Sequence, residues 1–252
     1  MEIAGSRILV TGGARGLGRS FALDLAAAGA RVGACDLDEA GLRELAAEAE
    51  AQGMAMWTRK ASVADEADVE SLFAGFVAEM GGIDAVVNNA GLNRDGLLVR
   101  KTGDLLEKLP LTSWQAVIDV DLTGVFLCSR EAAFHMVSQG GGGVIASISS
   151  LSWRGNVGQT NYSAAKAGVV AMTRTWAMEL ARYGIRAVAI APGLTATEMA
   201  LSMSDEARER LTATIPLRRM GEPSEMSHAL RFVLENDFVN GRVIGVDGGL
   251  RL

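Results

Sequence analysis

Short apolar runs alternate with longer amphipathic stretches along the whole chain. Most of these runs are continuous rather than alternating, which is typical of strands that are buried on both faces of a parallel sheet. Seven strands are predicted, over residues 7–11, 31–35, 55–58, 85–88, 144–147, 186–191 and 242–246. Their alternation with helical segments predicts an α/β protein: a Rossmann-type, doubly wound fold of about seven parallel strands with helices on both faces.

The segments between the strands carry apolar residues at helical spacing, most clearly over residues 37–51 and 65–80. Asp38 and Asp65 are predicted to cap these two helices, and the glycine run 140–143 is predicted to be a loop. No linker rich in Pro, Ser or Gly divides the 252 residues. One domain over residues 1–252 is therefore expected, with a cofactor half of about 1–150 and a catalytic and substrate half of about 140–252.

Composition argues against several classes of function. The net charge of −6 and the scattered arginines leave no basic surface for nucleic acid. Cys35 and Cys128 lie in apolar segments, as buried free thiols of a reducing compartment do. His135 and His228 lack Cys or acidic neighbours at metal-ligand spacing, so no metal site is expected. No export signal and no apolar stretch of about 20 residues is recognised, which predicts a cytoplasmic protein that does not bind membranes.

A glycine-rich segment, residues 11–18, follows the first strand and precedes a helical stretch. Glycines at such a turn let backbone N–H groups approach a pyrophosphate at the helix N-terminus. A purely structural turn is the alternative. The predicted cofactor-binding residues of this loop are Gly12, Arg15, Gly16, Leu17 and Gly18.

Asp36 follows the second strand, 18 residues after Gly18, with Leu37 beside it as a further cofactor contact. A carboxylate there accepts hydrogen bonds from the adenosine ribose hydroxyls and repels a 2′-phosphate, which predicts NAD rather than NADP. Arg15 inside the loop keeps NADP as the second choice. Asp36 can alternatively be a helix N-cap, although Asp38 already suits that role.

Tyr162 and Lys166 are four residues apart in a predicted helix and therefore share one face. A phenol is a weak base at neutral pH, but a neighbouring ammonium favours its ionised form. Tyr162 is thus predicted to be a general acid and base. Ser149 follows a strand thirteen residues earlier and is predicted to hydrogen-bond the substrate oxygen; Ser147, Ser150 and Ser152 are alternatives.

Taken together, these residues resemble the short-chain dehydrogenase/reductase family, and the resemblance extends over essentially the whole chain. It is carried by residues 11–18, the Asn-Asn-Ala-Gly segment 88–91, the set Ser149, Tyr162 and Lys166, the Pro-Gly pair 192–193, and the tail 241–249. The resemblance implies that Tyr162 and Lys166 also contact the nucleotide, with Lys166 on the nicotinamide ribose. The further cofactor residues that it implies are Ser62, Val63, Asn89, Ala90, Gly91, Pro192, Gly193, Thr195 and Thr197.

Two features depart from the family's pattern. Asp121 stands where the family usually has an asparagine that anchors a water leading to the lysine. We hypothesise that Asp121 is a fourth catalytic residue, which stabilises protonated Lys166 and still orients that water; a harmless exchange is the alternative. The segment from Arg100 to Pro110 is longer than usual and rich in charge, which predicts an exposed excursion, either at the surface or at the edge of the substrate site.

The expected reaction is hydride transfer between NAD(H) and a small secondary alcohol or ketone. The expected substrate pocket is lined by Asn93, Leu151, Trp153, Asn156 and Leu194, with residues 194–217 as a mobile lid. Residues 155–166 are similar to those of bacterial oxoacyl-carrier-protein reductases, so an NADP-dependent reductase of that kind is the alternative. A nucleotide-sensing protein without catalysis is a third reading. The family resemblance also implies a homotetramer, built partly from the helices near residues 122–136 and 163–182.

Overall fold

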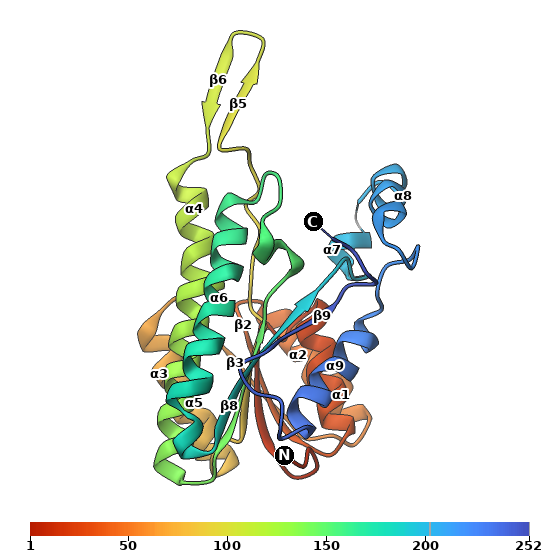
Figure 1. Ribbon diagram of the computed structural model, residues 1–252. Helices are drawn as coiled ribbons and strands as arrows, with labels where there is room; N and C mark the ends of the chain where they lie inside the picture. Colours follow the sequence, from red (N-terminus) through yellow and green to blue (C-terminus); the bar gives the residue numbers. More distant parts are fainter. Residues whose placement is uncertain (202, 252) are drawn as a thin grey trace.

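The central element of the protein is a parallel sheet of seven strands, seen in a computed structural model that describes residues 1–201 and 203–251 (Figure 1). The strand order is β3-β2-β1-β4-β7-β8-β9, and every neighbouring pair is parallel. The seven strands are β1 (Arg7–Thr11), β2 (Arg31–Asp36), β3 (Met56–Lys60), β4 (Ala85–Asn88), β7 (Gly143–Ile148), β8 (Ile185–Pro192) and β9 (Val243–Val246). The predicted fold class is confirmed, and only β3 lies noticeably off its predicted range.

Helices cover both faces of this sheet, because successive side chains of a buried strand point to opposite faces. Ile8 and Val10 of β1 join the core with α1, α2 and α9, whereas Leu9 between them joins the core with α3, α5 and α6. The first layer is α1 (Gly16–Ala27), α2 (Glu39–Ala51) and α9 (Pro223–Glu235); the second includes α3 (Glu66–Met80), α5 (Gly124–Gln139) and α6 (Thr160–Glu179). Both faces are apolar, as continuous runs predict.

Two predicted helix caps and the two predicted buried thiols are confirmed. The carboxylate of Asp38 accepts from Gly41 N at 3.1 Å, and that of Asp65 accepts from Asp68 N at 2.9 Å. Each bond satisfies a backbone donor that the first helical turn leaves unpaired. Cys35 and Cys128 are both free and buried.

The outer helical layer contains one long continuous helix, Leu111–Gln139, made of α4 (Leu111–Ile118), the π-helical turn η1 (Asp119–Thr123) and α5. By length and composition it is apolar enough to cross a membrane, which the sequence reading did not anticipate. Buried residues such as Val117, Leu127 and Met136 place its inner face in the fold, yet only 33% of its most apolar window is buried. An apolar outer face therefore remains uncovered.

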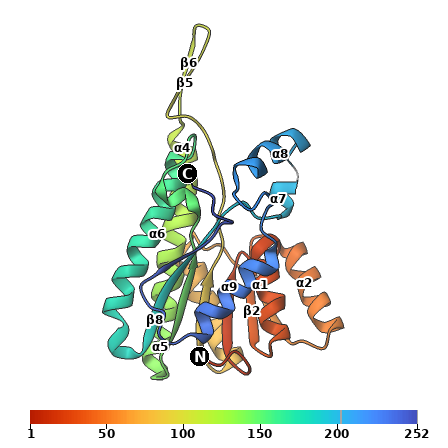
Figure 2. The ribbon, with the colours of Figure 1, turned by 45° about the vertical axis from the view of Figure 1, so that its right-hand side comes forward.

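The segment predicted as an exposed excursion is a β-hairpin, and its two strands were not predicted. It consists of β5 (Val99–Thr102) and β6 (Leu105–Lys108), which pair antiparallel with each other and not with the main sheet. All eight strand residues are exposed. The hairpin projects beyond α4, away from the sheet (Figures 1 and 2).

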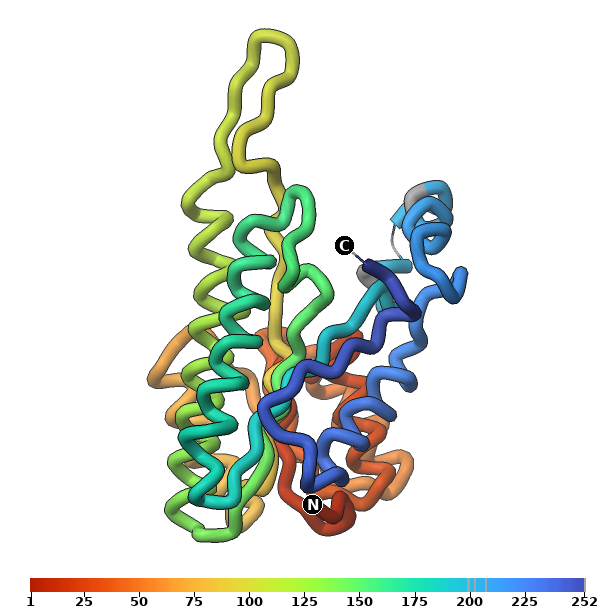
Figure 3. The backbone as a smooth tube through the Cα atoms, viewed as in Figure 1, coloured from red at the N-terminus to blue at the C-terminus, as the bar shows by residue number. Residues whose placement is uncertain are grey.

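The segment predicted as a lid contains the two short helices α7 (Glu198–Leu201) and α8 (Asp205–Thr214). They lie beyond the ends of α1, α2 and α9, on the side away from the hairpin (Figure 2). The remaining short elements are the 3₁₀ turns η2 (Leu151–Arg154) and η3 (Ala181–Tyr183). The chain begins at the end of the sheet where the strands start (Figure 3).

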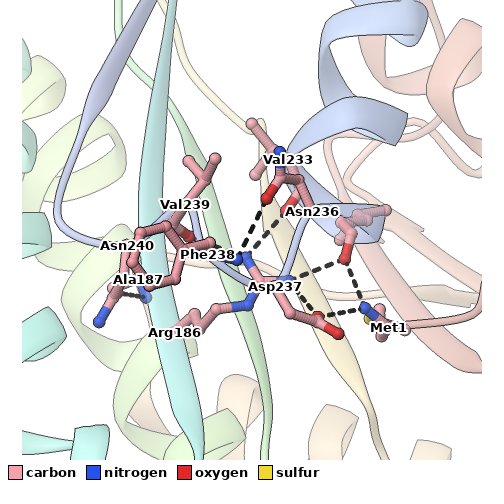
Figure 4. Close-up of polar contacts among 10 residues, drawn as sticks. Met1, Arg186, Ala187, Val233, Asn236, Asp237, Phe238, Val239 and Asn240 are labelled. Atoms are coloured by element: carbon pink, nitrogen blue, oxygen red, sulfur yellow. Dashed lines mark hydrogen bonds and ion pairs between the residues drawn. The ribbon is translucent and has the colours of Figure 1, made fainter.

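The amino end of the chain is tied to the end of α9 by Arg186 and Asp237 (Figure 4). The guanidinium of Arg186 donates to the carbonyls of Val233, Leu234 and Val239 at 2.8–3.0 Å, and it pairs with Asp237 at 3.4 Å. The terminal ammonium of Met1 donates to the Leu234 carbonyl at 2.9 Å and also to Asp237. Cations near the last carbonyls of a helix stabilise its end.

Candidate active site

The residues singled out in the sequence converge at the carboxyl ends of neighbouring strands. Gly12 follows β1, Asn89 follows β4, Ser149 follows β7 and Gly193 follows β8, and these four strands are adjacent in the sheet. In open α/β sheets this end is where ligands bind. The fold thus collects motifs that are as far as 180 residues apart into one site.

The glycine-rich turn is packed so closely that side chains do not fit. A Cβ at Gly18 would lie 2.0 Å from the Gly12 carbonyl oxygen, and a Cβ at Gly12 would lie 2.7 Å from the Ala90 Cα. Asn89 holds the turn, because its side-chain amide donates to the carbonyls of Thr11 and Gly12 at 3.1 and 3.0 Å. The backbone is therefore free to approach a pyrophosphate, as a dinucleotide site requires.

The rest of that loop leads directly into α1. Arg15 is exposed, Gly16 has a φ of +56° and is the first residue of the helix, and Leu17 is half-buried. Thr11, the first residue of the predicted segment 11–18, joins this loop to the end of the neighbouring strand β4. Its hydroxyl accepts from Asn89 N and Ala90 N at 3.0 and 3.1 Å.

Asp36 lies at the end of β2 and faces the glycine loop. One carboxylate oxygen accepts from Ala14 N at 3.1 Å and the other from Asp38 N at 3.0 Å. Asp38, not Asp36, caps α2, so the reading of Asp36 as the N-cap is wrong. Leu37 beside it is 63% exposed. The carboxylate is fixed where a nucleotide ribose is expected, and the residues present fit a dinucleotide.

Ser62 and Val63 follow β3, at the position that the resemblance gives to an adenine contact. The backbone N–H of Ser62 donates to Asp68 at 2.9 Å, and the Ser62 hydroxyl accepts from Ala64 N at 3.3 Å. Val63 is buried and touches α5, where a Cβ at Gly124 would lie 2.9 Å from its Cγ2. Asp68 therefore brings a carboxylate beside Ser62 that the sequence reading missed, because it comes from the following helix.

Tyr162 and Lys166 lie on successive turns at the start of α6, as their spacing predicts. The Lys166 ammonium is 5.3 Å from the centre of the Tyr162 ring. It donates to the Ile148 carbonyl at 3.1 Å, and the Ser149 hydroxyl donates to the Lys166 carbonyl at 3.1 Å. One connected, largely buried cluster thus joins Ser149, Tyr162 and Lys166.

Asp121 completes this cluster from η1. It is fully buried; one oxygen accepts from Leu92 N at 2.9 Å and the other lies 3.1 Å from Lys166 Nζ. Burial lowers the pKa of Lys166, but the charges of Tyr162 and Asp121 outweigh it, so that the pKa of Lys166 is raised above its usual value. The lysine is held as an ammonium beside the tyrosine.

The competing serines have structural partners. The Ser147 hydroxyl accepts from Asn88 at 3.1 Å, Ser150 caps η2, and the Ser152 hydroxyl donates to Gln159 at 2.8 Å. Ser149 is the serine that bonds the backbone of α6 within the Tyr162 cluster. This arrangement favours Ser149 over the other three.

Asn161 is a buried residue whose importance the sequence did not reveal. Its amide nitrogen donates to the carbonyls of Arg94 and Ser113 at 2.9 and 3.1 Å, and its oxygen accepts from Tyr162 N at 2.9 Å. It therefore ties two distant segments to the backbone of the tyrosine. An asparagine directly before Tyr162 was the only available signal.

The expected substrate and remaining cofactor residues come from the loops after β4, β7 and β8. Leu151 and Trp153 belong to η2, the Asn156 amide donates to Gln159 at 2.9 Å, and Asn93 follows the Asn-Asn-Ala-Gly segment. Pro192 ends β8, and Gly193 is pressed against Asp247, where a Cβ would lie 2.8 Å from its Cα. The next residues are Leu194, half-buried; Thr195, buried with its hydroxyl 3.3 Å from the Gly193 carbonyl; and Thr197, half-buried.

Within residues 1–201 and 203–251, no group of three or more His, Cys, Asp or Glu side chains is arranged to hold a metal ion. The site brings together phenol, ammonium, hydroxyl and carboxylate groups beside the dinucleotide cradle. These are the groups of acid/base catalysis coupled to hydride transfer.

Comparison with known proteins decides the family. The model of the family described as enoyl-(acyl carrier protein) reductase matches residues 12–251. The 3-oxoacyl-[acyl-carrier-protein] reductase FabG of Thermotoga maritima is 39% identical over 252 residues, covering 99% of both chains. The chain belongs to the short-chain dehydrogenase/reductase family. The resemblance seen in its motifs is thereby confirmed.

Further members of this family show the same extent of similarity. The reductase FabG of Staphylococcus aureus is 38% identical over 248 residues and 96% of both chains. A solved structure of a putative gluconate dehydrogenase from Agrobacterium tumefaciens has 35% identity and a TM-score of 0.89, covering 98% of this chain and 96% of the other. This short-chain dehydrogenase/reductase is an NAD(P)-dependent oxidoreductase, which excludes the reading as a sensor without catalysis.

Proposed function

We propose that this enzyme reduces the 3-oxo group of an acyl thioester carried by an acyl carrier protein. The sequence predicts this reaction as the alternative to the oxidation or reduction of a small secondary alcohol or ketone. The relatives favour the acyl thioester over the small substrate. The observation that carries it is an intact cluster of Ser149, Tyr162 and Lys166 in a chain that matches such reductases along 96–99% of its length.

We further propose NAD(H) as the preferred cofactor. Asp36 supports this preference, because its carboxylate is fixed by two backbone N–H groups at the place expected for the adenosine ribose. A 2′-phosphate would meet a like charge there. The glycine loop and α1 would hold the pyrophosphate, while Asn89, Lys166 and Thr195 would hold the nicotinamide half.

In the proposed mechanism Tyr162 gives its phenol proton to the carbonyl oxygen of the substrate. The bound dinucleotide supplies the hydride that the carbonyl carbon receives. Ser149 donates a hydrogen bond to the same oxygen, on which negative charge develops, and so stabilises the transition state. Lys166 favours the phenolate left behind, and Asp121 keeps Lys166 charged and in place as a positioning residue. In total, the ketone takes up one hydride and one proton and becomes a secondary alcohol.

A second candidate function is the oxidation of a polar secondary alcohol such as a sugar acid. The structural neighbour described as a putative gluconate dehydrogenase favours it, and so do the amide side chains of Asn93 and Asn156 among the proposed pocket residues. Leu151, Trp153 and Leu194 offer apolar contacts that suit an acyl chain better.

The deciding experiment is a substrate panel with all four nicotinamide dinucleotides. Acetoacetyl thioesters of an acyl carrier protein and of a short pantetheine analogue are compared with gluconate and simple secondary alcohols. We expect the highest kcat/KM for the thioesters with NADH. Turnover of gluconate with NAD and none of the thioesters would establish the second candidate instead, and a preference for NADPH would overturn the role given to Asp36.

The family resemblance also supports one catalytic domain, a cytoplasmic location and a homotetramer as parts of this proposal. Size-exclusion chromatography with light scattering measures the subunit number directly. A mass of four chains is expected.

A further inference from the structure

The hairpin β5–β6 with its flanking residues forms an arm, defined as residues 97–109, that the body of the protein does not support. Leu98 and Leu109 close its base through one hydrogen bond of 3.1 Å, and beyond this the strands pair only with each other. No other helix or strand in residues 1–201 and 203–251 packs closely on it. An isolated two-stranded hairpin is at best marginally stable in water.

The arm nevertheless carries large aliphatic side chains on both of its faces. Cross-strand pairing puts Val99 and Leu106 on one face, and Leu98 and Leu105 on the other. Their exposed fractions are 55%, 64%, 66% and 58%, respectively. Apolar side chains exposed along an unsupported element are a feature of protein contact surfaces.

Exposed apolar side chains also occur on the helices next to the arm. Leu111, the first residue of α4, is 76% exposed, and Phe134 of α5 and Met178 of α6 are 66% and 75% exposed. Figure 1 shows the arm extending α4 at the side of the molecule formed by these helices.

A second copy of this chain is the partner that these observations fit. Exposed apolar side chains on an element that the body does not support mark a protein contact, and soluble proteins most often assemble with copies of themselves. Charge agrees with this choice. Lys101 and Lys108 share the Val99 face, whereas the ion pair of the arm, Arg100 with Glu107 at 3.8 Å, lies on the opposite face. Each copy offers an excess of carboxylates, with a net charge of −6.

The base of the arm is connected to the catalytic tyrosine. Before the arm, the Arg94 carbonyl accepts from Asn161, and after it the Ser113 carbonyl accepts from the same amide nitrogen. Gly96 N also donates to the Gly158 carbonyl at 2.7 Å. Since Asn161 in turn accepts from Tyr162 N at 2.9 Å, both stems of the arm meet at the residue that holds the Tyr162 backbone.

We propose that the arm packs against a second copy of this chain and that the docked arm steadies Tyr162 through Asn161. The first part is independent of the reaction, while the second rests on the role proposed for Tyr162. Assembly would then complete the site, since a docked arm holds in place both stems that Asn161 joins.

The docking is tested with the variant Leu106→Cys, labelled with a benzophenone maleimide and irradiated as purified protein. Both native cysteines are buried, and burial raises the pKa of the Cys35 thiol to about 12 and that of Cys128 well above its ordinary value, so they react slowly. The matched control is Arg43→Cys on α2, whose side chain is 70% exposed on the other face of the sheet. We expect a two-chain product from Leu106→Cys and none from the control.

A product of single-chain mass only would overturn the docking. So would a cross-link that forms only when an acyl carrier protein is added, because the arm would then bind the substrate carrier. Neither readout depends on turnover, so a failure of the proposed function is seen separately in the substrate panel.

The link to Tyr162 is tested by replacing residues 100–107 with Asn-Gly, which joins the register partners Val99 and Lys108 by a tight turn. We expect kcat to fall about tenfold with the KM for the dinucleotide unchanged, because positioning of the acid/base is lost and nucleotide binding is not. The variant Asp104→Asn, at the tip, is the control. If the shortened chain does not fold, Leu98→Ser with Leu106→Ser serves instead. An unchanged kcat would overturn the link.

Discussion

The direct contact between Asp121 and Lys166 makes the isosteric variant Asp121→Asn informative. In the enzyme one oxygen of Asp121 accepts from Leu92 N and the other faces the Lys166 ammonium at 3.1 Å. An asparagine has only one such oxygen, and if it keeps the bond to Leu92, its NH₂ group faces the ammonium as a second donor. Lys166 then retains the Ile148 carbonyl but loses its anionic partner.

The size of the effect follows from the burial of both groups. Asp121 is fully buried and one of its oxygens lies 3.1 Å from Lys166 Nζ, so removing its charge leaves the buried ammonium without this anion. Removing one partner of a buried ion pair costs about 3 to 5 kcal/mol while the other stays charged, and this cost favours loss of the Lys166 proton. Lys166 and Asp121 are the charged groups of this cluster, and the Ile148 carbonyl and Ser149 hydroxyl beside them do not titrate.

Asp121 is one of the groups that raise the pKa of Lys166, so Lys166 in the variant should lose its proton at a lower pH. A neutral lysine no longer favours the phenolate of Tyr162, and the alkaline limb of kcat/KM in the oxidative direction should therefore move to lower pH. The assay is the pH profile with saturating dinucleotide, and Asp119→Asn, two residues earlier in η1, is the control. Asp119 accepts from Gln115 at 2.6 Å and does not belong to the cluster. A profile identical to that of the wild type, or an alkaline limb at higher pH, refutes the reasoning.

Three further predictions concern the proton donor, the cofactor and acid stability. Tyr162→Phe should lower kcat by about 10²- to 10⁴-fold, while fluorescence titration should show unchanged dinucleotide binding. A smaller loss of kcat would argue against Tyr162 as the proton donor. Asp36→Asn should reduce the preference for NADH over NADPH at least about tenfold in kcat/KM, because a like charge no longer faces the 2′-phosphate, and an unchanged ratio would contradict this. Burial raises the pKa of Asp84, but its bonds to Arg7 outweigh this and lower it, so the pair stabilises the fold above the ordinary Asp range and is lost on acidification. Urea unfolding of wild type and Asp84→Asn should then differ by about 1 kcal/mol at pH 7 and by less and less as the pH falls below the ordinary range of Asp; a difference that stays the same on acidification would argue against the ion pair.

The sheet and its two helical layers could be predicted from sequence because their signals are local. An apolar run such as Ile8–Val10 has to be covered on both faces wherever it lies, and Asp38 and Asp65 cap their helices within three residues. The arm was not predicted as strands, because its eight strand residues are all exposed and mix charged with aliphatic side chains. The spacing of apolar residues indicates which positions are buried, so it does not identify strands whose residues are all exposed.

The proximity of Tyr162 and Lys166 was predictable for the same reason, since they are one helical turn apart. Their surroundings were not. Asn161 contacts the carbonyls of Arg94 and Ser113, which are 67 and 48 residues away, and the contact of Asp121 with Lys166 depends on where a π-helical turn places one carboxylate. No spacing in the sequence encodes such distances.

Gly91 shows how these long-range contacts constrain a motif that the sequence reading assigned only to the cofactor. A Cβ at this position would lie 2.8 Å from the Asp121 carboxylate and 3.5 Å from Lys166 Nζ. The glycine thus leaves room for a buried ion pair between η1 and α6, beside the loop that receives the nucleotide. A carboxylate partner in place of the family's usual asparagine makes this room more critical, because a buried ammonium that is separated from its partner carboxylate is strongly destabilised. Gly91, Asp121 and Lys166 are therefore one structural unit. A substitution at any one of them is expected to change how the charge of Lys166 is compensated.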